Sequence, residues 1–203
     1  MAIKYCWISG IALLPFLLTL GCGKLGKVDQ GRAIEFDKAK GTVTLIRDLK
    51  ADPQKLNDSI LTPVTYTIPA DPAEMGAEPK VGYRMKLDTK KNQIVIFNPA
   101  SQNLKTIHYT LIDQKDNIAK DNPLVFDKAE EKPKKFPVID REKKTMAIYS
   151  GTQKILITFT VPEEYFTLPD KTWDAGDEVR IYYKEEGKAR RLMNVSQTDI
   201  FKK

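Results

Sequence analysis

Residues 36–45 read FDKAKGTVTL, residues 87–96 read LDTKKNQIVI and residues 139–148 read IDREKKTMAI. Each segment has an apolar residue, an aspartate, a polar and mostly basic turn, and then an alternating apolar run. Aspartate opens turns because its carboxylate accepts hydrogen bonds from the next backbone amides, and β-branched residues favour the strand that follows. Each segment therefore predicts a β-hairpin.

The strands that follow two of these hairpins predict a duplicated unit. From residue 31 a hairpin is followed by apolar segments at 63–69, 82–87 and 94–97, and from residue 136 a hairpin is followed by segments at 154–162, 176–183 and 191–195. Each series gives about five strands, the number found in SH3-like or OB-like barrels. We therefore predict an all-β fold: a tandem of two small five-stranded barrels, or one continuous β structure built from the duplicated unit.

The remaining segments set the boundaries of these units. Residues 104–112 alternate and predict an additional strand in the first unit, 31–126. Residues 127–135 contain seven charged residues and a proline with no apolar period, so they predict a linker before the second unit, 136–203. The only helical feature that we expect is one turn near residues 52–56.

The first residues have the pattern of a secretory signal peptide. Lys4 is followed by an uncharged apolar run, which contains Pro15 and ends in small residues before Cys22. The strongly apolar part is shorter than the ~20 residues that a membrane-spanning helix needs. Residues 1–21 are therefore predicted to be a signal peptide, with a plain secreted protein or a signal anchor as the alternatives.

The sequence Leu18-Thr19-Leu20-Gly21-Cys22 resembles the lipobox of bacterial lipoproteins. The chain is thus similar to the uncharacterised families of bacterial lipoproteins. The resemblance implies cleavage between Gly21 and Cys22, a covalent lipid on Cys22, and a lipidated tether over residues 22–30. Two or three acyl chains give a stable anchor, whereas one chain binds a membrane only marginally.

The residue after the lipidated cysteine implies a location. Gly23 stands where an aspartate would favour the inner membrane, so we expect the periplasmic face of the outer membrane in a Gram-negative host. In another host we expect the outer face of the cytoplasmic membrane.

The composition excludes several kinds of site. The 203 residues are 41% hydrophobic, which is enough apolar material for a core, and they carry a net charge of +6. One histidine and two cysteines are too few for most zinc, iron–sulfur or disulfide-based designs. The sequence also has no phosphate-binding glycine loop and no nucleophile elbow. We therefore expect no metal and no cofactor other than the lipid on Cys22.

Three aromatic residues are the candidate binding site. Tyr165, Phe166 and Trp173 flank the longest loop of the second predicted barrel, where exposed rings could hold a partner. The alternative is that these rings close the end of the barrel. A contiguous exposed patch would favour binding, and buried rings would favour a scaffold. The neighbouring acids Asp170, Asp174, Asp177 and Glu178 match no calcium-loop spacing that we can justify.

We expect a non-enzymatic interaction or scaffold module at the membrane. An alternative is a binding protein for an anionic polymer or peptide, since Lys184, Lys188, Arg190 and Arg191 form a basic stretch. A third alternative is an enzyme, whose acid–base chemistry would depend on carboxylates such as Glu163, Glu164, Asp170 and Asp174. The expected partners are the membrane, through the lipid anchor, and an envelope protein or anionic envelope polymer. Nucleic acid is not expected, because the protein is predicted to be exported.

Overall fold

The computed structural model describes residues 25–47 and 63–198. Cys22, Gly21, the predicted signal peptide and the helical turn predicted near residues 52–56 lie outside these residues. In the described part of the chain, no helix has the length and apolar character needed to cross a membrane.

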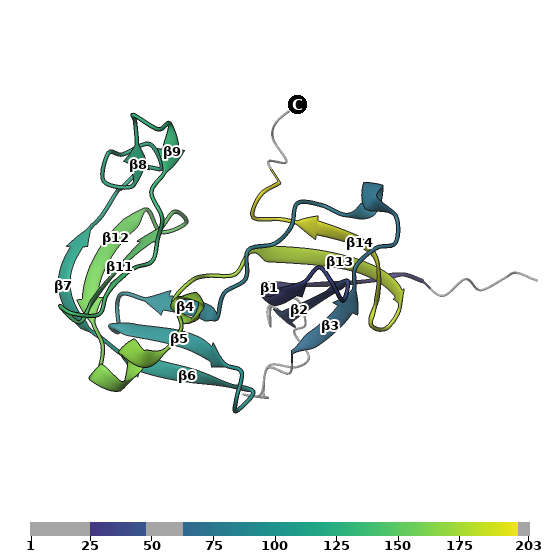
Figure 1. Cartoon of the computed structure of the whole chain (residues 1–203), viewed down its shortest axis with the longest axis horizontal. Coiled ribbons are helices and arrows are strands. Elements are labelled where there is room, and N and C mark those ends of the chain that lie inside the picture. The colour runs from purple at the N-terminus through teal and green to yellow at the C-terminus, as the bar shows by residue number, and fades with distance from the viewer. Residues whose placement is uncertain (1–24, 48–62, 199–203) are drawn as a thin grey trace, which may run out of the picture.

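Five strands form a closed barrel in the order β1-β13-β14-β3-β2 (Figure 1). Their bounds are Lys27–Asp37 for β1, Thr42–Arg47 for β2, Val64–Thr67 for β3, Glu178–Glu185 for β13 and Lys188–Asn194 for β14. β1 pairs with β13 on one side and with β2 on the other, so strands from both ends of the chain meet in one barrel. A parallel contact between Thr67 and Lys188 closes it.

The middle of the chain forms a second unit, which we call the inserted unit (84–173). One sheet has the order β4-β5-β6 and the other has the order β10-β11-β12-β7. The bounds are Arg84–Asp88 for β4, Gln93–Asn98 for β5, Asn103–His108 for β6, Thr110–Lys115 for β7, Val138–Asp140 for β10, Thr145–Ser150 for β11 and Ile155–Thr160 for β12. Only Tyr109 separates β6 from β7, so one stretch of chain enters both sheets.

Short elements complete the fold. The strands β8 (Phe126–Asp127) and β9 (Lys132–Pro133) form a small separate hairpin. In residues 25–47 and 63–198, three short 3₁₀ helices lie in the connections: η3 (Pro72–Glu74), η4 (Glu163–Thr167) and η5 (Asp170–Thr172).

Each unit has its own core. The alternation of β12 buries Ile155, Ile157 and Phe159 between the two sheets of the inserted unit, as a two-residue period requires. The barrel core is built from residues such as Val43, Leu45 and Ile181. The strand alternation therefore places one face of each sheet inward, as the sequence predicts.

A third apolar cluster joins the two units. Ile34 of β1 and Ile46 of β2 lie on the outside of the barrel and pack with Phe97 of β5. Tyr83 and Leu104 pack against the same cluster. This cluster explains why Ile46 of β2 is buried although it lies outside the barrel: Val43 and Leu45 face the barrel core, and Ile46 packs against the inserted unit.

The all-β fold is confirmed, but the tandem of two barrels is not. Most predicted strands lie where expected, although residues 104–112 divide into β6 and β7. The closed barrel takes β1, β2 and β3 from the predicted first unit and β13 and β14 from the predicted second unit. Alternation identifies a strand but not its partner, so the sequence pattern cannot distinguish two successive barrels from one barrel with an insertion.

The predicted hairpin turns are confirmed. The Asp37 carboxylate accepts hydrogen bonds from the backbone N–H groups of Ala39 and Lys40, at 3.0 and 2.9 Å. Asp88 accepts from Lys91 at 3.1 Å and Asp140 from Lys143 at 2.8 Å.

The predicted linker 127–135 contains the same turn. Asp127 accepts hydrogen bonds from the backbone N–H groups of Ala129 and Glu130, at 2.9 and 3.3 Å, and the turn joins β8 to β9. The sequence FDKA at 126–129 is also the sequence at 36–39. This repetition is the signal that identifies the segment as a hairpin despite its high charge.

Candidate functional site

The three predicted binding residues do not form an exposed patch. Trp173 is fully buried and Phe166 is nearly so, and both belong to the core of the inserted unit. Tyr165 is half-buried and packs against that core. The rings of Trp173 and Phe166 therefore stabilise the fold, whereas Tyr165 lines a pocket.

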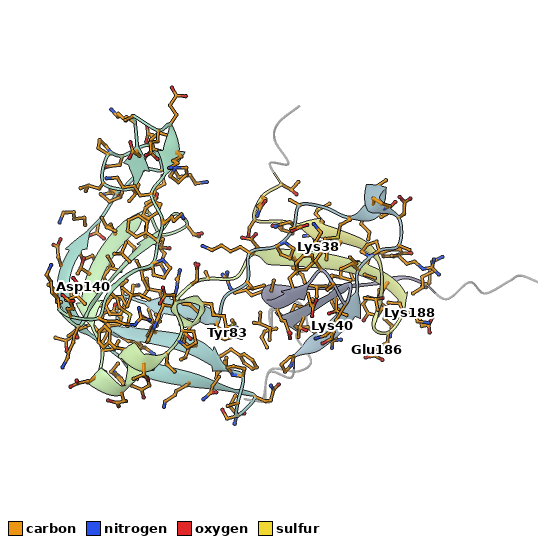
Figure 2. All side chains as sticks on the ribbon, viewed as in Figure 1. Lys38, Lys40, Tyr83, Asp140, Glu186 and Lys188 are labelled. Atoms are coloured by element: carbon orange, nitrogen blue, oxygen red, sulfur yellow. The ribbon has the colours of Figure 1, made fainter. Side chains whose placement is uncertain are left out.

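That pocket, which we call the aromatic pocket, lies between the β4-β5-β6 sheet and the segment 164–172. Its volume is about 540 Å³. Its lining includes the rings of Tyr83, Phe97 and Tyr165, together with apolar side chains such as Leu168 and Pro169. Phe97 and Tyr83 also belong to the apolar cluster that joins the barrel to the inserted unit, and Figure 2 shows Tyr83 between the two units. The aromatic pocket is thus next to the junction of the units.

Two lysines give this pocket a positive charge. The Lys105 ammonium lies 4.7 Å from the centroid of the Tyr165 ring, and the Lys171 ammonium lies 4.9 Å from the centroid of the Tyr83 ring. Such cation–π contacts hold an ammonium in place without neutralising its charge. The carboxylate of Glu164 also lines the pocket. The pocket therefore combines apolar walls with two ordered cations and one anion.

The backbone near the pocket is fixed by two segments that cross between the units. The N–H of Tyr83 donates to the carbonyl of Lys171 at 2.9 Å, and the N–H of Arg84 donates to the carbonyl of Asp174 at 2.9 Å. Tyr83 and Ala175 form an antiparallel bridge. Because Tyr83 and Lys171 are bonded through their backbones, the ring and the ammonium that contacts it have a fixed spacing.

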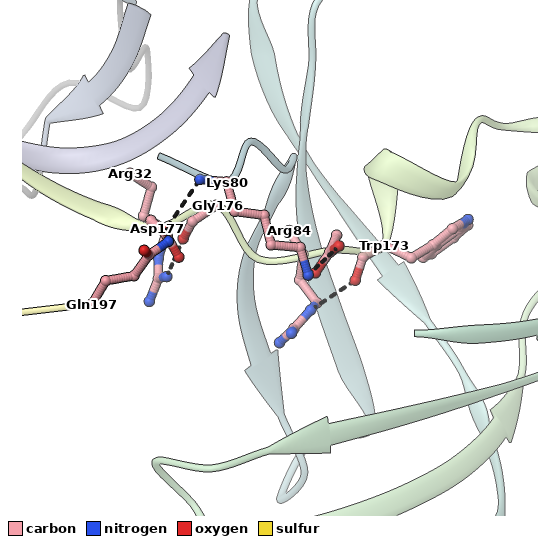
Figure 3. Close-up of polar contacts among 8 residues, drawn as sticks. Arg32, Lys80, Arg84, Trp173, Gly176, Asp177 and Gln197 are labelled. Atoms are coloured by element: carbon pink, nitrogen blue, oxygen red, sulfur yellow. Dashed lines mark hydrogen bonds and ion pairs between the residues drawn. The ribbon is translucent and has the colours of Figure 1, made fainter. Parts of the chain in front are cut away.

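Arginine side chains support this crossing, as Figure 3 shows. The Arg84 Nε atom donates to the carbonyl oxygen of Trp173 at 2.9 Å, and Arg32 donates to the carbonyl oxygen of Gly176 at 3.1 Å. Burial lowers the pKa of Arg84 to about 10; the Asp174 carboxylate opposes this shift and Arg32 adds to it. Arg84 is still protonated at neutral pH, so the junction contains a largely buried positive charge.

A second concavity, the basic groove, lies beside the aromatic pocket and shares Lys171 with it. Its volume is about 610 Å³. It is lined by four lysines, Lys80, Lys134, Lys135 and Lys171, by Asp170 and Asp174, and by Phe136, Pro137 and Tyr149. The two acids are engaged: Lys80 pairs with Asp174 at 2.7 Å and Arg141 pairs with Asp170 at 2.6 Å.

The other polar residues that the sequence analysis considered, such as Asp177 and His108, contact neighbouring side chains of the fold. Asp177 accepts hydrogen bonds from Asn194 and Gln197, both at 2.8 Å, and from the backbone N–H of Lys80 at 2.9 Å. Within residues 25–47 and 63–198, no group of three or more histidine, cysteine or acidic residues is placed to hold a metal ion. His108 is exposed and contacts Gln93 across the strands β6 and β5.

The sequence identified Tyr165 but missed the other pocket residues. Tyr83 and Lys105 are far from Tyr165 in the chain, and they come together only because the segment 164–172 folds over the β4-β5-β6 sheet. Trp173 and Phe166 flank a predicted loop, which left both exposure and burial open; in the structure that loop forms η4 and η5 and buries both rings. No local pattern distinguishes the buried rings from the half-buried one.

Comparisons with known proteins find one family. Neither the curated proteins nor the solved structures gave a match. A family model described as a domain of unknown function, DUF4881, matches residues 24–203. Since this match covers most of the sequence, the chain belongs to the DUF4881 family.

Proposed function

We propose that this protein is a membrane-anchored lipoprotein of the bacterial cell envelope that acts without catalysis, as an interaction or scaffold module. The observation that carries the proposal is the aromatic pocket at the junction of the barrel and the inserted unit. Its rings are held by the crossing segments and by the cluster of Ile34, Ile46 and Phe97, so it is preformed. A preformed site loses little free energy to ordering when a partner binds.

The composition of the aromatic pocket suits one kind of group on a partner protein. Its volume is within the ~300–1,000 Å³ typical of ligand sites. Apolar walls favour an apolar or aromatic side chain, and the ammonium groups of Lys105 and Lys171 favour a neighbouring carboxylate. We therefore propose that the partner presents an apolar side chain beside an acidic one.

The proposed anchor rests on the lipobox that ends at Cys22. The family match starts at residue 24, so the proposed signal peptide lies outside the matched region. β1 begins at Lys27, so residues 27–30 of the predicted tether are part of the first strand and only a shorter tether remains between the proposed lipid and the barrel. In a Gram-negative host, Gly23 supports the periplasmic face of the outer membrane; in another host the outer face of the cytoplasmic membrane is proposed.

Replacement of Cys22 tests the anchor. We expect that Cys22→Ala removes incorporation of a clickable fatty acid in growing cells, because the thioether forms on that sulfur. The variant should also accumulate as an uncleaved precursor. Equal labelling of the wild type and the variant would contradict the lipid anchor.

Site-specific cross-linking tests the pocket. A photoreactive amino acid at position 165 should give a discrete cross-linked protein in intact cells, and the same amino acid at the exposed turn residue Thr152 should not. Lys105→Glu should reduce this cross-link, because it reverses the charge beside Tyr165, whereas Lys90→Glu in the distant β4–β5 turn should not. The same cross-linked protein from both positions would refute a specific pocket.

The basic groove favours a second function, the binding of an anionic polymer or peptide. The observation is that Lys80, Lys134, Lys135 and Lys171 converge from three separate segments. We expect Lys134→Glu with Lys135→Glu to abolish salt-sensitive retention on immobilised poly-glutamate. The control, Lys90→Glu with Lys91→Glu, makes the same change of net charge elsewhere. Equal loss in both variants would show that only net charge matters.

A further inference from the structure

We propose that one end of the barrel docks on a bilayer surface that contains anionic phospholipids, and that this contact orients the whole protein. The docking face is made of Lys27 and Val28 at the start of β1, and of Lys184, Lys188 and Arg190 in and beside the β13–β14 turn. The inference rests on the proposed lipid anchor at Cys22, and it adds the surface that faces the membrane.

The strand pairing places these residues at the point where the tether leaves the barrel. Lys27 is opposite Tyr183, two residues before β13 ends at the β13–β14 turn. A Cβ atom at Gly26 would lie 2.0 Å from the Tyr182 ring, so the chain leaves the barrel in contact with β13. The start of β1 and the β13–β14 turn are therefore neighbours.

The length of the tether limits the distance of this face from the lipid. Cys22 is five residues before Lys27. A fully extended chain spans at most ~3.5 Å per residue, so the tether reaches about 17 Å. This reach is comparable with the thickness of a headgroup layer and the Debye length of the solution added together. The docking face therefore lies within electrostatic range of the headgroups.

The charge of the face is complementary to an anionic surface. Lys27, Lys184, Lys188 and Arg190 are all exposed. The acidic residues of the turn are Glu185 and Glu186, and Glu185 pairs with Lys188 at 2.8 Å. Lys27, Lys184, Lys188 and Arg190 thus outnumber these two acidic residues by two, while Arg191 of the same segment pairs with Glu74. The exposed side chains of Leu25 and Val28 add apolar contact at the same end.

A weak attraction is sufficient, because the anchor makes the contact intramolecular. Each basic residue near an anionic leaflet shifts the ratio of docked to undocked protein about fivefold, equivalent to ~1 kcal/mol. Tethering supplies a high effective concentration, so two or three such residues populate one orientation.

The orientation has a consequence for the aromatic pocket. Figure 2 shows Glu186 and Lys188 at one end of the long axis, and Asp140 of the inserted unit at the other. A protein docked through the β13–β14 turn therefore directs the inserted unit away from the bilayer. The aromatic pocket is then open to a partner in the surrounding compartment.

Lysine footprinting of the full lipidated protein tests the inference. The protein is reconstituted in phosphatidylcholine vesicles with or without phosphatidylglycerol, and acylated with a membrane-impermeant amine reagent. We expect Lys184 and Lys188 to react about fivefold more slowly when phosphatidylglycerol is present. Lys90 and Lys91 in the β4–β5 turn should react equally in both vesicles. The protection should disappear near ~0.5 M NaCl, where the Debye length is only a few Å.

Matched variants separate a docking face from general charge. Lys184→Glu with Lys188→Glu should remove the protection of Lys27, whereas Lys90→Glu with Lys91→Glu should preserve it. If the protein floats with the vesicles but its lysines react equally with both lipid compositions, the docking face is refuted and the anchor stands. A wild-type chain that carries no lipid in cells overturns the anchor, and this inference with it.

Discussion

Several turns of this protein have a residue with a left-handed backbone at the same position in the turn. It is four residues after the side chain that opens the turn: Gly41 after Asp37, Asn92 after Asp88, Glu131 after Asp127, Lys144 after Asp140, and Lys154 after Ser150. Their φ angles are 62°, 51°, 49°, 53° and 55°. Glycine and asparagine adopt this conformation readily, whereas lysine and glutamate are strained in it. The turns with Gly41 and Asn92 thus have a residue that suits this backbone conformation, whereas those with Glu131, Lys144 and Lys154 have a strained one.

The strain predicts a stabilising substitution. Lys154 is exposed, and Lys154→Gly should raise the free energy of unfolding by up to about 1 kcal/mol, since the left-handed cost of roughly 1–2 kcal/mol exceeds the entropy cost of glycine. Thr152→Gly in the same turn, where φ is not positive, should lower it by about 0.5–1 kcal/mol. Urea denaturation measures both, and destabilisation by both glycines would contradict the assigned strain.

The turn aspartates predict a loss of stability in acid. The hydrogen bond from the Lys143 backbone is the main cause that lowers the pKa of Asp140 below its usual 3.8. Because the folded-state pKa is below the unfolded-state pKa, the carboxylate stabilises the fold above about pH 4, and this contribution is lost as the pH falls through the folded-state pKa. Asp140→Asn keeps an oxygen acceptor but cannot ionise.

The measurement compares urea midpoints of the wild type and Asp140→Asn from neutral pH to pH ~2. The two proteins should differ most near neutral pH and converge as the pH falls below about 4. A constant difference at every pH would show that the aspartate acts only as a neutral acceptor.

At the level of elements, the sequence predicted strands and turns but not pairing. The period-2 pattern and the aspartate turns depend on neighbouring residues, so β2, β3, β11 and β12 lie where expected. The pairing of β1 with β13 joins residues about 150 positions apart, as between Gln30 and Arg180, and no local pattern records it. The aromatic pocket was missed for the same reason, since Tyr83 meets Lys171 only through the crossing segments.

The observed pairing predicts the outcome of proteolysis at the β8–β9 hairpin. This hairpin is exposed and contains several lysines, so trypsin should cut first within residues 128–135. The two fragments should remain together in native gel filtration, because β12 pairs with β7 and β13 pairs with β1 across the cut. They should separate only in denaturant. Separate native elution would instead support two independent barrels.

In the whole molecule, the inserted unit interrupts the barrel between β3 and β13. The barrel cannot close until the chain has passed through the inserted unit, since β13 and β14 supply two of its five strands. Gly176 lies where the chain returns to the barrel: a Cβ atom there would be 2.0 Å from the carbonyl oxygen of Ala33 and 3.2 Å from the nitrogen of Gly82. The barrel strand β1 and the two crossing segments thus meet at a point with no room for a side chain.

This close contact predicts that the two units unfold together and that Gly176 couples them. Gly176→Ala should lower the free energy of unfolding by about 1–3 kcal/mol, because the methyl group forces the backbone of β1 away from the segments that cross between the two units. Small-angle scattering should then show a broader range of maximum dimensions. Gly151→Ala is the matched control, since its added Cβ atom would have its nearest neighbour at 3.7 Å, an ordinary contact. If both variants keep wild-type stability and dimensions, the close contact at Gly176 does not couple the barrel to the inserted unit, and the prediction is wrong.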